Sequence, residues 1–146
     1  METGIKVGDC MKTSLVTVPE STSVVDAAKK MAETGVGSLL VFSSAKGIYD
    51  IITERDLVSK VLATGKTNYL VRDICTKNLI TIQITEDISI AAKLMGAKNI
   101  KRLAVIRQGK IVGVVSQKDL ISIAPSLYDL ISESPQMPLA QKLKVY

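Results

Sequence analysis

The second half of this chain repeats the first half. When the 146-residue sequence is shifted by 64 positions, residues 7–42 align with residues 71–106, and ten of these 36 positions are identical. Chance gives roughly two identities over that length, at about one match in fifteen positions. A shift of 63 aligns residues 48–59 with 111–122 and adds four identities. A repeat of this length predicts one structural unit that is built twice.

Each repeat predicts five elements in the order strand, helix, strand, strand, helix. The first helix is expected at Val24–Glu33, because apolar residues recur there at spacings of three and four after the N-cap candidate Ser23. Its counterpart begins after Asp87, and short second helices begin after Thr53 and after Ser116. Apolar, β-branched runs predict the strands, which are 15–18, 38–42 and 48–52 in the first repeat and 79–82, 102–106 and 111–115 in the second.

These elements predict an α/β (α+β) fold of two β-α-β-β-α units packed with pseudo-two-fold symmetry. A unit of about 60 residues buries too little surface to be secure alone, so the two copies should pack face to face and leave a cleft for a ligand. Residues 1–66 are the first repeat, 67–124 the second and 125–146 a C-terminal tail. The tail predicts a short helix closed by Pro135, which packs on its own domain or contacts a second subunit.

Composition excludes several classes of chemistry. The chain has no histidine, no tryptophan, one phenylalanine and two cysteines, Cys10 and Cys75. Histidine-based catalysis, a zinc site and a row of aromatic platforms for single-stranded nucleic acid are therefore not expected. No activated nucleophile or carboxylate pair is evident, so we expect neither an enzyme nor a metal site. The cysteines are interpreted as small buried hydrophobes, with a regulatory disulfide as the alternative.

No apolar run approaches the ~18 residues of a membrane span, and the first residues lack a secretory signal. These features predict a cytoplasmic protein without a membrane partner.

The positive charge is concentrated in the second repeat. Residues 67–124 hold nine basic and four acidic side chains, which accounts for the whole net charge of +5. Such a local field favours a partner that carries phosphate. The alternative is a nucleic-acid-binding surface, made by Lys98, Lys101, Arg102, Arg107 and Lys110.

The most specific local motif occurs twice, as Thr53-Glu54-Arg55-Asp56 and Ser116-Gln117-Lys118-Asp119. One interpretation is a capping box, in which a hydroxyl residue and an acid three positions later cap a helix. The other uses the same geometry for binding: the helix start attracts phosphate, and the aspartate accepts hydrogen bonds from a ribose diol. Gly113, before the second motif, would allow a base or sugar to approach the backbone.

Taken in order, these pieces resemble a tandem pair of cystathionine β-synthase (CBS) domains, a Bateman module. The resemblance covers about residues 5–124. It is carried by Val7–Met11, Thr17–Pro19, Asp26–Met31 and Ile51–Leu57 in the first repeat, and by Ala91–Met95, Ile100–Ile106 and Val112–Leu120 in the second.

The resemblance implies a stand-alone regulatory sensor that binds an adenosine-containing ligand in clefts between the repeats. AMP, ADP or ATP is expected, S-adenosylmethionine or NAD less so; no cofactor is required, and a homodimer with an unknown effector protein is implied. Asp56 and Asp119 would hold ribose hydroxyls. Residues near phosphate would be Thr53, Ser116, Arg55, Lys118, Lys101 and Arg102, and residues near adenine would be Thr17, Val18, Thr81 and Ile82.

The first repeat departs from the family pattern. Asp50 stands at the usual glycine position, where its charge would repel a phosphate. Gly37-Ser38 replaces the basic pair Lys101-Arg102. The site anchored by Asp119 is therefore expected to be the better one.

Overall fold

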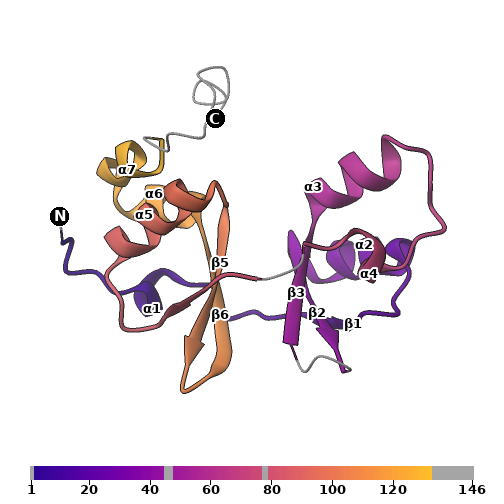
Figure 1. Cartoon of the computed structure of the whole chain (residues 1–146), viewed down its shortest axis with the longest axis horizontal. Coiled ribbons are helices and arrows are strands. Elements are labelled where there is room, and N and C mark those ends of the chain that lie inside the picture. Colours follow the sequence, from indigo (N-terminus) through magenta and orange to yellow (C-terminus); the bar gives the residue numbers. More distant parts are fainter. Residues whose placement is uncertain (1, 45–47, 77–78, 133–146) are drawn as a thin grey trace. The chain divides into compact units, whose positions relative to one another are not determined.

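Two three-stranded sheets, one from each repeat, organise the chain (Figure 1). The computed structural model describes residues 2–44, 48–76 and 79–132. In each sheet the middle strand pairs with its first neighbour in parallel and with its second neighbour antiparallel. The strands are β1 (Thr17–Pro19), β2 (Ser38–Ser43) and β3 (Ile48–Thr53), followed by β4 (Thr81–Gln83), β5 (Arg102–Arg107) and β6 (Lys110–Ser116). The prediction of a mixed α/β fold with two repeats is confirmed.

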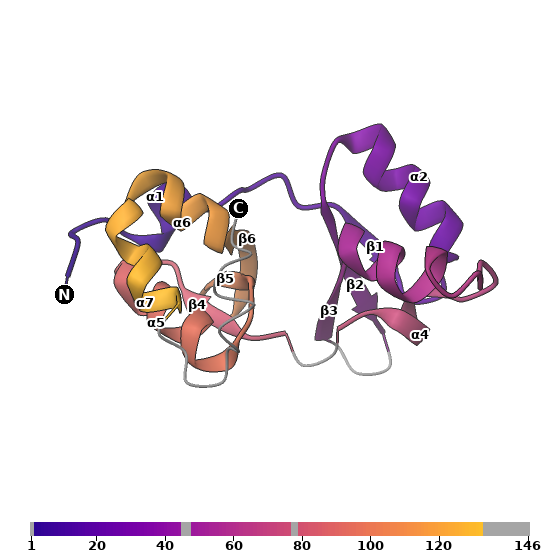
Figure 2. The same cartoon turned by 90° about the horizontal axis from the view of Figure 1, so that it is seen from above.

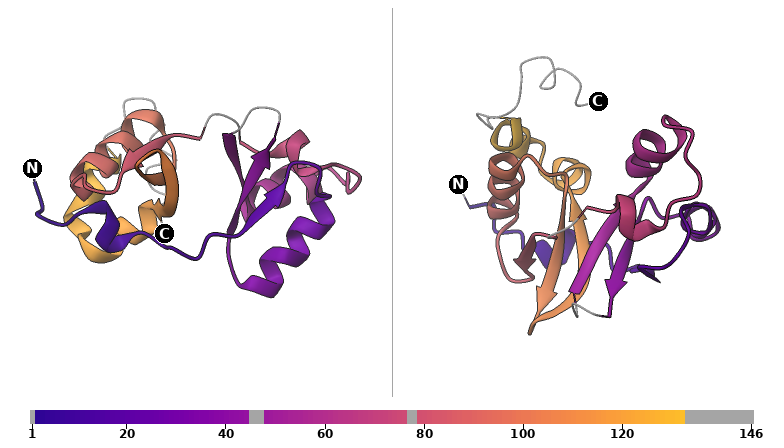
Figure 3. Two further views of the ribbon diagram at one scale, coloured as in Figure 1. Left: turned by 90° about the horizontal axis from the view of Figure 1, so that it is seen from below. Right: turned by 45° about the vertical axis from the view of Figure 1, so that its right-hand side comes forward.

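The long helix of each repeat covers one face of its sheet (Figures 2 and 3). These helices are α2 (Val24–Thr34) and α5 (Ile88–Lys98). Ser23 caps α2 by accepting a hydrogen bond from the backbone N–H of Asp26 at 3.0 Å, and Asp87 caps α5. Each helix ends on a residue in the left-handed region, where the cap N–H satisfies a terminal carbonyl. The core of each unit lies between the helix stripe and the sheet.

The short helix that opens each repeat packs in the unit of the other repeat. Helix α1 (Val7–Cys10) lies with β4–β6, where the Val7 N–H donates to the Glu86 carbonyl at 2.8 Å. Helix α4 (Val71–Ile74) lies with β1–β3, where the Val71 N–H donates to the Thr22 carbonyl at 2.8 Å. The first-repeat unit is therefore Leu15–Leu79, and the second-repeat unit combines the N-terminal segment up to Ser14 with the chain from Ile80 onward. The predicted boundaries at residues 66 and 124 divide the sequence into repeats, and they differ from the boundaries of the two structural units.

The last helix of each repeat differs between the two units. Helix α3 (Glu54–Asp56) continues into the π-helical segment η1 (Leu57–Leu62), in which the Ala63 N–H reaches back five residues to the Val58 carbonyl. Helix α6 (Gln117–Ile123) is α-helical throughout.

The start of the tail packs on α5. A 3₁₀ turn, η2 (Pro125–Leu127), leads into α7 (Tyr128–Ser132), and Figure 2 shows α7 beside α5. The second face of α5, which carries Ser89, Ala92 and Gly96, is buried, whereas the equivalent face of α2 is exposed. Leu127 and Ile131 are fully buried in the same core. The expected helix end at Pro135 falls outside the described residues.

Gly96→Ala tests the close packing of α7 on α5. A Cβ at Gly96 would lie 2.7 Å from the Leu130 carbonyl oxygen and 3.1 Å from that of Ile131. Both atoms are backbone, so α7 must move, and we expect a loss of roughly 1–3 kcal/mol in the free energy of unfolding. Helix propensity alone predicts the opposite sign, a gain of about 1 kcal/mol. Denaturant unfolding distinguishes the two, and a variant more stable than the parent contradicts the described packing.

Candidate functional site

The first Ser/Thr-x-x-Asp motif lies where β3 passes into α3. Thr53 is the N-cap of α3, and Asp56 is its third residue. Asp56 Oδ2 accepts hydrogen bonds from the Thr53 backbone N–H at 2.9 Å and from the Thr53 hydroxyl at 3.1 Å. In return, the Asp56 N–H donates to Thr53 Oγ1 at 3.2 Å. Two helix-start donors are satisfied reciprocally, which is the geometry of a capping box.

The second motif repeats this arrangement where β6 passes into α6. The Ser116 N–H donates to Asp119 Oδ2 at 3.0 Å, and the Asp119 N–H donates to Ser116 Oγ at 3.1 Å. The capping-box interpretation is therefore confirmed in both repeats. In both motifs the box uses only the Oδ2 atom, so the Oδ1 atom of each carboxylate is left for another partner.

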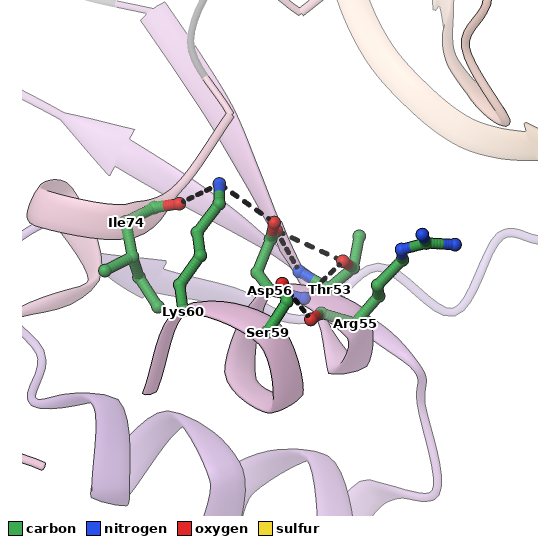
Figure 4. A network of polar contacts seen from close by, with 6 residues as sticks. All are labelled: Thr53, Arg55, Asp56, Ser59, Lys60 and Ile74. Atoms are coloured by element: carbon green, nitrogen blue, oxygen red, sulfur yellow. Dashed lines mark hydrogen bonds and ion pairs between the residues drawn. The ribbon is translucent and has the colours of Figure 1, made fainter. Parts of the chain in front are cut away.

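Each Oδ1 atom faces a lysine that the sequence analysis did not single out. Lys60 Nζ lies 3.1 Å from Asp56 Oδ1 and also donates a hydrogen bond to the Ile74 carbonyl at 2.8 Å (Figure 4). Lys12 Nζ lies 3.7 Å from Asp119 Oδ1. The spacing of four residues between Asp56 and Lys60 is a recognisable helix-pair signal. Lys12 has no such signal, because it reaches Asp119 only through the exchange of the opening helices.

Both carboxylates stay in contact with solvent. The Asp56 side chain is 12% exposed and the Asp119 side chain is 16% exposed. Both side chains are therefore mostly covered but not completely removed from solvent.

In the second-repeat unit, the predicted phosphate residues lie at the same end of the sheet as the motif. Arg102 pairs with Ser116 across β5 and β6, and the Gln117 N–H donates to the Lys101 carbonyl at 2.9 Å. Lys101 is exposed and Arg102 is half-buried. The predicted adenine residues lie on β4, where Thr81 is exposed and Ile82 is buried. The chain therefore brings basic, hydroxyl and carboxylate groups together in this unit.

The first-repeat unit places uncharged residues where the second has its basic pair. Ser38 pairs with Thr53 across β2 and β3, and the Glu54 N–H donates to the Gly37 carbonyl at 3.0 Å. On β1, Thr17 is exposed and Val18 is buried.

The residue directly before the aspartate is basic in both motifs. Arg55 and Lys118 are both exposed. Figure 4 shows the Arg55 side chain pointing away from the Asp56 carboxylate.

The residue three positions before each motif differs between the repeats, and so does the side chain that it contacts. A Cβ at Gly113 would lie 2.5 Å from Met11 Sδ and 3.0 Å from the Lys12 carbonyl oxygen, so the N-terminal segment itself approaches this glycine. At the equivalent position Asp50 is buried, with Oδ2 4.0 Å from the thiol of Cys75. Cys75 is the repeat counterpart of Met11. Glycine is therefore accompanied by the long methionine in one unit, and the larger aspartate is accompanied by the small cysteine in the other. Approach of a ligand to Gly113 stays a prediction.

Asp87 ties the N-terminal segment to the start of α5. Its carboxylate is 4% exposed and accepts hydrogen bonds from the N–H groups of Thr3, Gly4 and Ser89, at 2.8–3.1 Å, and from the Thr3 hydroxyl at 2.9 Å. Burial by itself raises the pKa of Asp87, but the hydrogen bonds from Ser89 and Thr3 outweigh it and hold the pKa well below its ordinary value.

We expect Asp87→Asn to destabilise the protein at neutral pH and to do so less in acid. A depressed folded-state pKa adds stability above the unfolded-state pKa, near 3.8, and that stability is lost as the pH falls below it. Thermal unfolding at pH 7, 5, 4 and 3 measures the difference from the parent, which should shrink below about pH 4. Asp129→Asn, an exposed change on α7, is the control. An equal difference at every pH contradicts the role given to the Asp87 charge.

Cys10 lies close to the second motif, and its thiol is buried. Burial raises the pKa of its thiol to about 11, with further contributions from the negative charges of Asp119 and Asp9. Both cysteines are buried free thiols, which agrees with their interpretation as small hydrophobes.

Alkylation of Cys10 at pH 8 should be at least ~100-fold slower in the folded protein than in denaturant, because the thiolate is scarce at a pKa of about 11. Peptide mapping by mass spectrometry follows Cys10 separately from Cys75. Asp119→Asn removes a charge that disfavours the thiolate, so it should accelerate the reaction. Labelling of the folded protein at the denatured rate would rule out this environment.

Within residues 2–44, 48–76 and 79–132, no cluster of three or more histidine, cysteine or acidic side chains is placed to hold a metal ion. In the same part of the chain, no helix combines the length and apolarity needed to cross a membrane.

The CBS domain family model matches the chain twice, at residues 7–63 and 71–126. An uncharacterised protein of Methanopyrus kandleri is 34% identical over 132 residues, which span 88% of this chain and 67% of that relative. A homoserine O-acetyltransferase of Methanosalsum zhilinae is 38% identical over 117 residues, which span 80% of this chain but only 23% of the transferase.

Two similar solved structures contain ligands. A CBS domain protein of Pyrobaculum aerophilum, complexed with AMP, superposes with a TM-score of 0.72 at 25% identity, covering 86% of this chain and 98% of that one. The CBS domain pair of a second protein, in complex with 5′-methylthioadenosine and S-adenosyl-L-methionine, superposes with a TM-score of 0.71 at 25% identity, covering 84% of this chain and 97% of that one.

Proposed function

The chain belongs to the CBS domain family, and on this premise we propose that it is a regulatory module that binds an adenosine-containing ligand and communicates its occupancy to a partner protein. The ligand class is AMP, ADP or ATP, with S-adenosylmethionine or NAD as less favoured members. The proposed site, termed the Asp119 site, consists of Asp119, Ser116, Lys101, Arg102, Thr81 and Ile82.

One observation carries the proposal: the Asp119 carboxylate is held rigidly by one oxygen and is available through the other. In the capping box, Asp119 Oδ2 lies 3.0 Å from the Ser116 nitrogen. Asp119 Oδ1 forms an ion pair with the exposed Lys12, whose Nζ lies 3.7 Å away. A carboxylate oriented in this way accepts charge-assisted hydrogen bonds from a ribose diol. Lys101 and Arg102, at the same end of the sheet, supply positive charge for a phosphate.

The ligand-bound relatives support the same ligand class. AMP, 5′-methylthioadenosine and S-adenosyl-L-methionine share an adenine and a ribose with free 2′ and 3′ hydroxyls, whereas only AMP carries a phosphate. The chemistry common to them is the nucleoside, which is what Asp119 and β4 would recognise.

The module acts by binding rather than by catalysis. A ligand that prefers one conformation shifts the population toward it and changes the affinity for a partner by linkage. The proposal also includes a cytoplasmic location, since both cysteines are free thiols. It includes a homodimer, because Val58 and Leu62, one turn apart on η1, expose apolar side chains.

Nucleic-acid binding is the second candidate, because Lys98, Lys101, Arg107 and Lys110 are all exposed. Binding of that kind would weaken steeply with salt, because the release of counterions from the nucleic acid gains less free energy at high salt. Binding of a nucleoside through Asp119 would depend on salt much less.

Thermal unfolding with AMP, ADP, ATP, S-adenosylmethionine, NAD and short DNA and RNA tests the function. A ligand at 100 times its dissociation constant adds ~2.7 kcal/mol to the free energy of unfolding, which raises the melting temperature by several degrees. We expect an adenosine ligand to give this shift and Asp119→Ala to weaken binding about ten- to a hundredfold, as the loss of charge-assisted hydrogen bonds implies.

Asp9→Ala is the matched control, because Asp9 forms the same kind of capping contact in the same unit, with Oδ2 3.1 Å from the Lys6 N–H. Equal ligand-induced shifts of the melting temperature in the parent and in Asp119→Ala would show that Asp119 does not contact the ligand. A shift with DNA or RNA alone would favour the second candidate.

A further inference from the structure

Asp56 and Asp119 occupy equivalent positions in the two repeats, but their lysine partners do not. Lys60 follows Asp56 by four residues, and its counterpart in the second repeat is Ile123. Lys12 precedes the first strand, and its counterpart is Thr76. The same Oδ1 atom therefore faces a lysine in both units, but the two lysines come from different parts of the chain and lie at different distances.

Lys60 is held on two sides. Its ammonium group lies 3.1 Å from Asp56 Oδ1 and donates to the Ile74 carbonyl at 2.8 Å. Figure 4 shows the side chain spanning from η1 to α4, with the ammonium group between these two acceptors. A ligand hydroxyl that took Asp56 Oδ1 would have to separate Lys60 from a carboxylate and disturb its contact with a helix-end carbonyl.

Lys12 is held much less firmly. Its side chain is 77% exposed, compared with 45% for Lys60, and the distance to Asp119 Oδ1 is 3.7 Å, beyond hydrogen-bond length. Solvent screens such an exposed pair, so it adds little stability and yields easily to a better partner. The Lys12 backbone stays fixed by its paired hydrogen bonds with Val114, at 2.9 and 3.0 Å, whichever way the side chain turns.

We propose that Lys60 is an internal counter-ion that holds Asp56 closed to ligand, so that the chain binds one adenosine ligand, at Asp119. This inference rests on the proposed function and adds to it the residue that sets the stoichiometry. Lys60 occupies the place of the ribose hydroxyls at the first motif, whereas Lys12 leaves the second motif open.

Calorimetric titration of the full chain tests this assignment. The probes are AMP and adenosine, which carries the same diol without phosphate and so does not depend on the charge of Lys60. The parent should bind one AMP per chain. Lys60→Met should gain a second binding event with one of the probes, at least tenfold tighter than any such event in the parent, and Lys60→Met/Asp56→Ala should lose it again. Lys12→Met, the matched control, should keep a single event.

The outcomes separate the inference from the function beneath it. A folded Lys60→Met variant, verified by cooperative unfolding, that still shows one event with both probes overturns the role of Lys60. If Lys60→Met fails to fold, Asp56→Ala in the parent decides: unchanged AMP stoichiometry and affinity support the assignment, and loss of one event overturns it. Binding of AMP to the parent that Asp119→Ala leaves intact overturns both, as does the absence of binding by every adenosine ligand named above.

Discussion

The candidate site depends on the different contacts that the two oxygens of one carboxylate make. In each motif Oδ2 completes the capping box, which fixes the carboxylate against the strand end and satisfies the helix-start N–H groups. Oδ1 is left outside the box, and a partner that bound there would meet a side chain whose freedom the box already limits. The structural and the binding interpretations of the motif are thus compatible, because the cap would make the carboxylate a preorganised acceptor for the proposed ligand.

Most of the fold within each repeat could be predicted, because the signals are local. The helix stripe, the caps at Ser23 and Asp87, and the capping boxes at Thr53 and Ser116 depend on residues a few positions apart. The exchange of α1 and α4 could not be predicted in this way. Val7 and Val71 occupy equivalent positions in the repeat, and both are buried. Because the two residues are identical, the sequence does not indicate which core each one enters; this depends on the path of the chain.

The site was predicted less completely, since its differences arise from contacts between distant residues. Gly113 is explained by the approach of Met11, which lies more than a hundred positions earlier, and Asp50 by the neighbouring small Cys75. A side chain at position 113 would clash with Met11, whereas the larger residue Asp50 is accompanied by the smaller Cys75. The repeat alignment shows the substitutions, but only the structure shows that the two positions are neighbours in each unit.

The position of Lys12 bears on how occupancy could be communicated. Lys12 is fixed to β6 through Val114, and the chain passes into the first-repeat unit three residues later, at Leu15. A ligand at the proposed Asp119 site would remove the partner of the Lys12 ammonium while the backbone bridge remains, and would so change the charge balance beside one of the segments that join the units. The coupling can be no larger than the ligand's difference in affinity for the states of that segment. A loosely held lysine therefore suits a site that must be both accessible and sensitive, whereas the doubly held Lys60 suits a structural contact.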